Sequence, residues 1–279
     1  MEYKTLDLTI DNGVAHIKFN RPDKLNTMIS EFWSEIIEVC DRLNETTEVM
    51  ATIISSSGRY FTAGMDVSVF QNWAPDPKAD PARNAERTQR TVVKVQQTFN
   101  AIADLRMPVL VAVQGGCIGG GVDLISSCDM RYCTEDASFC IQEINIGMAA
   151  DAGTLQRLPK LISLGIMKEL AYTGRRLNAA EAKDCGLVNR VYTTHEEMLE
   201  DVERIALEIS RRSPMGIYAS KKAIDFAIDH TIAESLDQMT ILQAGMISFA
   251  DVMTALQAQA TKTDPKFRGL LTEPVKIGS

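Results

Sequence analysis

The sequence predicts a mixed α/β core of about 190 residues that is followed by an all-helical tail. Short runs rich in β-branched residues alternate with longer amphipathic stretches as far as residue 192. From His195 onward nearly every segment has a helical pattern, and Pro214 is the main break. The chain has 279 residues, of which 45% are hydrophobic, so it can bury a substantial core. We therefore divide it into a core of residues 1–195 and a helical region of residues 196–279.

The first elements are predicted from turn and cap residues. Residues 6–20 form a hairpin, because two alternating runs flank Asn12-Gly13, a strong two-residue turn signal. Ser30 is expected to cap an amphipathic helix that ends near Asn44. Residues 69–81 contain three prolines and are predicted to form a surface loop, or alternatively a lid over a site.

The remaining elements follow the same alternation. In chain order we expect a buried strand at 51–58, a long helix at 82–104, a buried strand at 107–115, short strands at 130–133 and 138–141, helices to about 185 and a last strand at 186–192. The tail repeats apolar residues at helical spacing in "ILQAGMISFADVMTALQAQA". Such a face needs a partner surface, which is either the chain's own core or another subunit.

Composition excludes several classes of function. A net charge of −8 argues against a dedicated nucleic-acid binder, and an anionic small ligand would need a local patch or helix N-termini. The six cysteines form no C-x-x-C pair and are expected to be reduced structural thiols. No apolar run approaches the length of a membrane span, and no targeting signal is evident, so we expect a cytoplasmic location.

Two loops at strand ends could supply hydrogen-bond donors. The segment "QGGCIGGGVDL" places five glycines within seven residues between a strand and a helix, and it fits neither a dinucleotide fingerprint nor a P-loop. Alone it could be a tight turn that binds nothing. The second loop contains Ala63, Gly64 and Met65. Together the loops could each aim one backbone N–H at a single oxygen, as a thioester oxyanion requires.

Three carboxylates follow these loops: Asp123, Glu143 and Asp151. Each alone has an ordinary explanation, because Asp123 could favour a helix N-terminus, Glu143 could be a surface acid and Asp151 could be a helix N-cap. Together with two donor loops they favour a catalytic site. Carboxylates in one apolar pocket cannot all stay ionised, so at least one pKa rises and an acid/base pair results. Their titrations are then coupled.

The motifs resemble those of the crotonase (enoyl-CoA hydratase/isomerase) superfamily over nearly the whole chain. The segments that carry the resemblance, in order, are "NRPDKLNTM", "FTAGMDV", "GGCIGGGVDL", "CDMRYCTEDASF", "QEINIGMAADAGTLQRLPK" and "ELAYTGRRLNAAEAKDCGLVNRV". The resemblance implies a spiral of ββα units, with residues 1–195 as the acyl-CoA-binding catalytic core. It also implies that residues 196–279 are a helical trimerisation region, in trimers that often pair as hexamers.

Within the superfamily the chain is most similar to the Δ3,5-Δ2,4-dienoyl-CoA isomerases. In the hydratases two glutamates hold a water, whereas here the first position is Asp123 and the second is Glu143. A third acid, Asp151, stands where hydratases have a small residue, usually glycine. The resemblance implies that all three acids line one pocket around the acyl chain.

The resemblance also implies roles for individual residues. The N–H groups of Met65 and Gly120 would form the oxyanion hole, and Glu143 would remove a proton from C2. Protonated Asp151 would donate to C6, while Asp123 would hydrogen-bond Glu143 and tune it. The residues implied to bind substrate are Ala63, Gly64, Gly119 and Lys24. No metal is needed, and coenzyme A enters only as part of the substrate.

The expected function is therefore isomerisation of 3,5-dienoyl-CoA to 2,4-dienoyl-CoA in the degradation of unsaturated fatty acids. The first alternative is a 2-enoyl-CoA hydratase, against which Asp123 and Asp151 argue because both alter the water site. The second is an acyl-CoA-binding homologue without turnover, against which the donor loops and acids argue. No nucleic-acid or membrane partner is expected.

Overall fold

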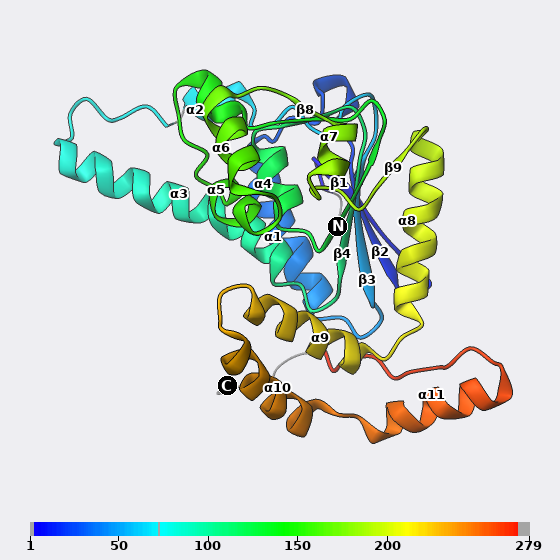
Figure 1. Cartoon of the computed structure of the whole chain (residues 1–279). Coiled ribbons are helices and arrows are strands. Elements are labelled where there is room, and N and C mark those ends of the chain that lie inside the picture. Colours follow the sequence, from blue (N-terminus) through cyan, green and yellow to red (C-terminus); the bar gives the residue numbers. More distant parts are fainter. Residues whose placement is uncertain (1–2, 72, 273–279) are drawn as a thin grey trace.

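The computed structural model describes residues 3–71 and 73–272 (Figure 1). The strands are β1 (Leu6–Asp11), β2 (Val14–Phe19), β3 (Ala51–Ser56), β4 (Val109–Val113), β5 (Gly116–Ile118), β6 (Met130–Thr134), β7 (Ser138–Cys140), β8 (Leu177–Asn178) and β9 (Arg190–Tyr192). The helices of the core are η1 (Pro22–Lys24), α1 (Ser30–Asn44), α2 (Val67–Gln71), α3 (Pro81–Ala103), α4 (Gly120–Ser126), η2 (Gln142–Ile146), α5 (Thr154–Arg157), η3 (Leu158–Lys160), α6 (Leu164–Thr173) and α7 (Ala179–Asp184). The last helices are α8 (His195–Ser210), α9 (Pro214–Ala227), α10 (Ile232–Met246) and α11 (Phe249–Thr261).

The main sheet has six strands in the order β1-β2-β3-β4-β6-β9. Only β1 and β2 are antiparallel, and the later pairs are parallel. The predicted hairpin is confirmed: Asp11 pairs with Val14, and both Asn12 (φ 49°) and Gly13 (φ 80°) take the positive φ that a tight hairpin turn requires. Parallel neighbours place several strand ends along one edge of the sheet, and the loops there carry the candidate site.

Helices cover both faces of this sheet. The consecutive residues Ile53 and Ile54 of β3 are both buried but point to opposite faces, as strand geometry dictates. Ile54 belongs to the large core beneath α1 and α3, whereas Ile53 packs in a smaller cluster with Met198 and Val202 of α8. The central strands are therefore buried on both faces, which explains their continuous apolar runs.

A second sheet of three short strands, β5-β7-β8, lies beside the first. The chain passes from β4 through Gly115 (φ 58°) directly into β5, and β5 leads into α4. A Cβ on Gly115 would lie 1.9 Å from the carbonyl oxygen of Arg59, so only glycine fits there. This close approach brings the glycine-rich segment against the loop that follows β3.

Several element boundaries differ from those expected. Ser30 is the first residue of α1 rather than its cap; the cap position belongs to Ile29, which makes no side-chain cap hydrogen bond. Part of the segment 69–81, expected to be a loop, belongs to α2, and its residue 72 lies outside the described residues. The long helix is confirmed, and Asp80 caps it by accepting hydrogen bonds from the N–H groups of Ala82 and Arg83. The last strand is shorter than expected because Gly186 (φ 84°) turns the chain before β9 begins.

After α8 the chain forms a group of helices beside the core, as Figure 1 shows for α9, α10 and α11, and an ion pair between Lys221 and Asp129 joins α9 to the core. α10 packs against α9 but has no buried residue, and large apolar side chains of α10 and α11 are exposed. No single described helix is long and apolar enough to cross a membrane; α10 and α11 reach that length and composition only as a pair, which is bent by 82°. The domain boundary at residue 195 stays a prediction.

Candidate active site

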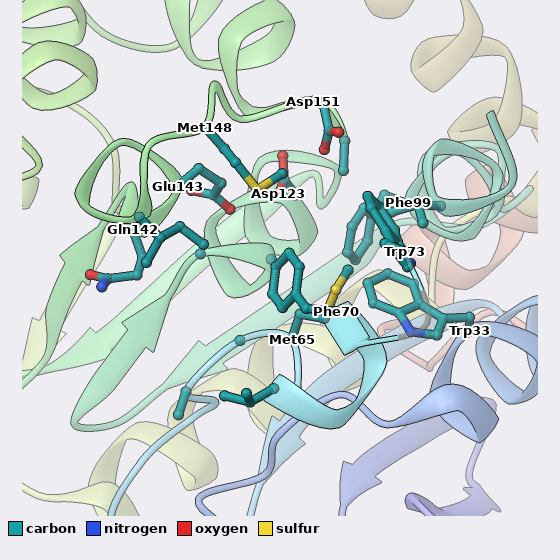
Figure 2. Close-up of a pocket in the computed structure, with 18 residues that line it drawn as sticks. Trp33, Met65, Phe70, Trp73, Phe99, Asp123, Gln142, Glu143, Met148 and Asp151 are labelled. Carbon is teal, nitrogen blue, oxygen red and sulfur yellow. The ribbon is translucent and has the colours of Figure 1, made fainter. Parts of the chain in front are cut away.

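The candidate site is a cavity of about 420 Å³ between the loop that follows β3 and the start of α4 after β5. Figure 2 shows carboxylates and Met148 on one wall and aromatic side chains on the opposite wall. The residues that line the cavity are Trp33, Ala63, Gly64, Met65, Val67, Phe70, Trp73, Val95, Phe99, Gly119, Gly120, Asp123, Gln142, Glu143, Ile146, Met148, Asp151 and Ala152. All three predicted acids and both predicted donor loops therefore meet in one place.

Backbone pairing fixes the two donor loops against each other. The N–H of Ile118 donates to the carbonyl of Thr62 at 3.1 Å, and the Thr62 N–H donates to Gly116 at the same distance. Gly64 (φ 86°) lies so close that an added Cβ would stand 2.6 Å from the Ile118 oxygen and 3.6 Å from the Gly120 nitrogen. The glycines at these positions are therefore required by the close approach of the two loops.

The two expected oxyanion donors are free to bind a ligand. Met28 exchanges hydrogen bonds with the neighbours of Met65, accepting from Asp66 and donating to Gly64, so the Met65 N–H points away from Met28. Gly120 begins α4 and has no intrahelical acceptor. Within the described part of the chain, neither N–H donates to another residue. Both belong to residues that line the cavity, as an oxyanion hole requires.

Glu143 lies in η2 beside the donor loops. A Cβ on Gly119 (φ 55°) would stand 3.2 Å from Glu143 Oε1, so the missing side chain leaves room for this carboxylate. Its Oε2 is buried, and no described group donates a hydrogen bond to it. Burial, followed by the charges of Asp123 and Asp151, raises the Glu143 pKa from 4.5 to about 7. A carboxyl with a pKa near neutrality is suited to exchange protons with a substrate.

Asp123 occupies the first turn of α4 and is 2% exposed. We expected it to hydrogen-bond Glu143, and that expectation is wrong: among the described residues no hydrogen bond joins them, and Asp123 Oδ1 instead accepts from the N–H of Thr154 at 2.7 Å. Burial raises the Asp123 pKa to about 6 although this hydrogen bond lowers it. Asp123 therefore influences Glu143 through its charge, and it holds the start of α5.

Asp151 lies in the irregular segment between η2 and α5. The alternative reading of Asp151 as a helix cap is wrong, because Gly153 takes the cap position and the side chain that accepts from the first amide of α5 is that of Asp123. The carboxyl lines the cavity, and burial raises its pKa above the ordinary value. Figure 2 shows Asp151 near the top of the cavity, beyond Asp123 as seen from Glu143. The cavity thus contains three acids of raised pKa, which is the condition for an acid/base pair.

Of the four expected substrate contacts, Ala63, Gly64 and Gly119 line the cavity and Lys24 does not. Lys24 is exposed at the end of η1, next to Leu25, whose carbonyl accepts from the Ala63 N–H at 2.9 Å. Lys24 therefore lies near the loop that contains Ala63, Gly64 and Met65, but outside the cavity. Its role in substrate binding stays a prediction.

The aromatic wall was not predicted from the sequence. Trp33 of α1 and Phe99 of α3 stack edge to face, with ring centroids 5.8 Å apart. Phe70 and Trp73 come from the α2 region, and their centroids are 5.9 Å apart. The four rings give the cavity an apolar wall suited to an acyl chain. The only available signal was the possible lid at 69–81, because aromatic residues on helix faces usually belong to a core.

Known proteins agree with this architecture. Residues 9–270 match the family model of enoyl-CoA hydratase/isomerase. A Δ3,5-Δ2,4-dienoyl-CoA isomerase of Rattus norvegicus is 39% identical over 95% of this chain and 82% of its own length. One from Arabidopsis thaliana is 35% identical over 96% of this chain and 98% of its own. The structure of an enoyl-CoA hydratase from Bacillus anthracis superposes with a TM-score of 0.86 at 29% identity, over 96% of this chain and all of that one.

These relatives bear on three expectations. The names of the isomerase relatives place them in mitochondria or peroxisomes, so the cytoplasmic location stays a prediction. The predicted fold class, an α/β core with a helical C-terminal region, is confirmed by the superposition and by the family match. The resemblance seen in the motifs is confirmed as well: the chain belongs to the enoyl-CoA hydratase/isomerase family.

Proposed function

We propose that this protein is a Δ3,5-Δ2,4-dienoyl-CoA isomerase. The observation that carries the proposal is the third carboxylate, Asp151, in the same cavity as Glu143 and the two free donors. A proton must leave C2 and another must arrive at C6, so the reaction needs proton-transfer groups at two separate positions along the acyl chain. The isomerase relatives, identical at up to 39% of positions, support this choice within the family.

The reaction begins at the thioester. Its carbonyl oxygen accepts hydrogen bonds from the N–H groups of Met65 and Gly120, which stabilises negative charge on that oxygen. Glu143 removes a proton from C2, and the electron pair delocalises through the two double bonds to C6. Asp151 donates a proton to C6, which leaves double bonds at C2 and C4. One proton is removed and one is added, so the reaction consumes no cofactor, and coenzyme A remains attached as the thioester.

The pKa values bear on which acid holds the proton. Glu143 has a pKa of about 7, so it holds a proton for much of the time at neutral pH. Asp151 is only partly buried. An acyl chain that covers Asp151 removes water from it and raises its pKa further. The charge of Asp151 is one cause of the raised Glu143 pKa, so protonation of Asp151 in turn favours ionisation of Glu143. The opposite protonation of the two acids would serve the reverse reaction.

A direct assay tests the proposal. The purified protein is incubated with 3,5-dienoyl-CoA and, separately, with 2-enoyl-CoA, and the diene absorbance and product masses are followed. We expect conversion of the first to 2,4-dienoyl-CoA and little hydration of the second. Hydration without isomerisation would assign the site to the hydratases. Binding of both ligands without turnover would make the protein an acyl-CoA-binding homologue.

We also propose that α10 and α11 pack between subunits of a homotrimer or of a hexamer built from two trimers. The support is their exposed apolar surface: Ile232 is 81% exposed, Ile241 74% and Phe249 71%. Patches of this kind on soluble proteins usually mark interaction sites. Light scattering at micromolar concentration should give three or six chains, and a monomer would contradict the proposal.

A further inference from the structure

The segment that carries Asp151 has little backbone support of its own. Among the described residues, none of residues 149–152 takes part in a backbone–backbone hydrogen bond. Three side-chain contacts hold the segment and the helix that follows it. One is the bond from the Thr154 N–H to Asp123, and the other two come from α3.

The first contact from α3 is made by Gln96. Its Nε2 donates to the backbone carbonyl of Asp151 at 2.7 Å, across 55 residues of sequence. Gln96 does not line the cavity, whereas Val95 and Phe99 of the same helix do. The amide of Gln96 therefore reaches the residue that carries the carboxyl without touching the space for the acyl chain.

The second contact lies one helical turn further along. Arg157 Nη2 donates to Asn100 Oδ1 at 2.5 Å, and residues four apart share one face of a helix. The guanidinium lies under Gly153, where an added Cβ would stand 1.9 Å from Arg157 Nη1. One face of α3 therefore contacts the chain on both sides of Gly153. Gln96 binds the carbonyl of Asp151 before it, and Asn100 binds Arg157 after it.

We propose that Gln96 is a positioning residue, which holds Asp151 at the distance from Glu143 that proton donation to C6 requires. This inference rests on the proposed function. Glu143 does not depend on α3 in this way, because its segment is supported locally: Met148 donates to the Glu143 carbonyl at 2.9 Å. Loss of the Gln96 amide should therefore affect the step at C6 and leave the step at C2 almost unchanged.

The test compares Gln96→Leu with Gln97→Leu. Leucine removes the donor at similar size, and Gln97 is the exposed neighbour on the same helix, which makes it the matched control. Gln96→Glu is a second variant that keeps the length of the side chain and replaces the donor group. Each is assayed in deuterated water with 3,5-dienoyl-CoA, and both turnover and deuterium exchange at C2 are measured by mass spectrometry.

We expect turnover by both Gln96 variants to fall about tenfold to a hundredfold, the usual effect of misplacing a catalytic group by about 1 Å. KM and C2 exchange should change less than about threefold, so the ratio of exchange to turnover should rise at least about threefold. Gln97→Leu should match the wild type. Equal loss of exchange and turnover would show a general structural role and overturn the inference, as would unchanged turnover. If the wild type itself does not isomerise the substrate, the proposed function fails first, and the inference fails with it.

Discussion

Replacing Glu143 by glutamine should stabilise the folded protein at alkaline pH. Burial and neighbouring charges raise the Glu143 pKa from 4.5 to about 7, and each pKa unit corresponds to about 1.4 kcal/mol. Ionising this carboxyl therefore costs the folded state about 3 kcal/mol relative to the unfolded chain. Glutamine has nearly the same shape and never ionises.

The sign of the pH dependence follows from the direction of the pKa change. Below pH 4.5 the carboxyl is protonated in both states, so its stabilising contribution is fully present. Between pH 4.5 and 7 the unfolded chain ionises while the folded state stays protonated, so that contribution falls, and it is fully lost once the pH has risen through the folded pKa of about 7. The free energy of unfolding of Glu143→Gln minus that of the wild type should therefore grow by about 2.5 kcal/mol between pH 5 and pH 8.

The assay is urea unfolding at pH 5, 6, 7 and 8, at one protein concentration because association contributes to stability. Glu200→Gln is the control, since Glu200 is exposed on α8 and lies outside the cavity. Asp123 remains in both proteins, and its raised pKa should leave a smaller pH dependence in the variant. A difference between Glu143→Gln and wild type that does not change with pH would refute the reasoning.

Three further outcomes are expected. Asp151→Asn should lose about a hundredfold to ten-thousandfold in isomerisation rate, while its acyl-CoA affinity, measured by calorimetry, stays within about threefold of the wild type. Asp41→Asn, at an exposed position of α1, is the control. Full turnover by Asp151→Asn would remove the role assigned to this acid. Gly64→Ala places a Cβ 2.6 Å from the Ile118 oxygen at a φ of 86°, so the free energy of unfolding should drop by about 1–3 kcal/mol and kcat by at least about a hundredfold. The pH profile of kcat/KM should fall on the acid side near pH 7 as Glu143 gains its proton, and a fall near pH 4.5 would contradict its raised pKa.

Local signals in the sequence predicted most of the fold. The Asn12-Gly13 turn specified its hairpin, because both residues tolerate positive φ, and Asp80 followed by Pro81 marks the start of α3. The sequence could not predict the order of strands in the sheet, since it depends on contacts between distant segments. It also could not predict β8, which has two residues and therefore shows no alternation.

The parts of the site whose residues lie in short sequence motifs could be predicted. The glycine segment and the three acids were visible together, and the structure brings them to one cavity. Partners across long distances in sequence were not visible. Asp123 bonds Thr154, which is 31 residues away, and Gln96 reaches Asp151 from a helix whose exposed face looks like that of any surface helix. The sequence could not distinguish Trp33 from a core residue, because the protein core and an acyl-binding pocket are both lined by large apolar side chains.

The role of Asp123 explains how a small change in sequence alters the use of one cavity. Family resemblance places a glutamate here in hydratases, where it helps to hold a water. Aspartate is shorter by one methylene, and one of its oxygens is bound to the Thr154 N–H, the first amide of α5. The segment thus fixed carries Asp151, whose carboxyl lies in the cavity beyond Asp123. The same position therefore supports the third acid and, through its charge, raises the pKa of Glu143. Asp123 therefore links two parts of the site, because the segment that its side chain fixes also carries Asp151 into the cavity.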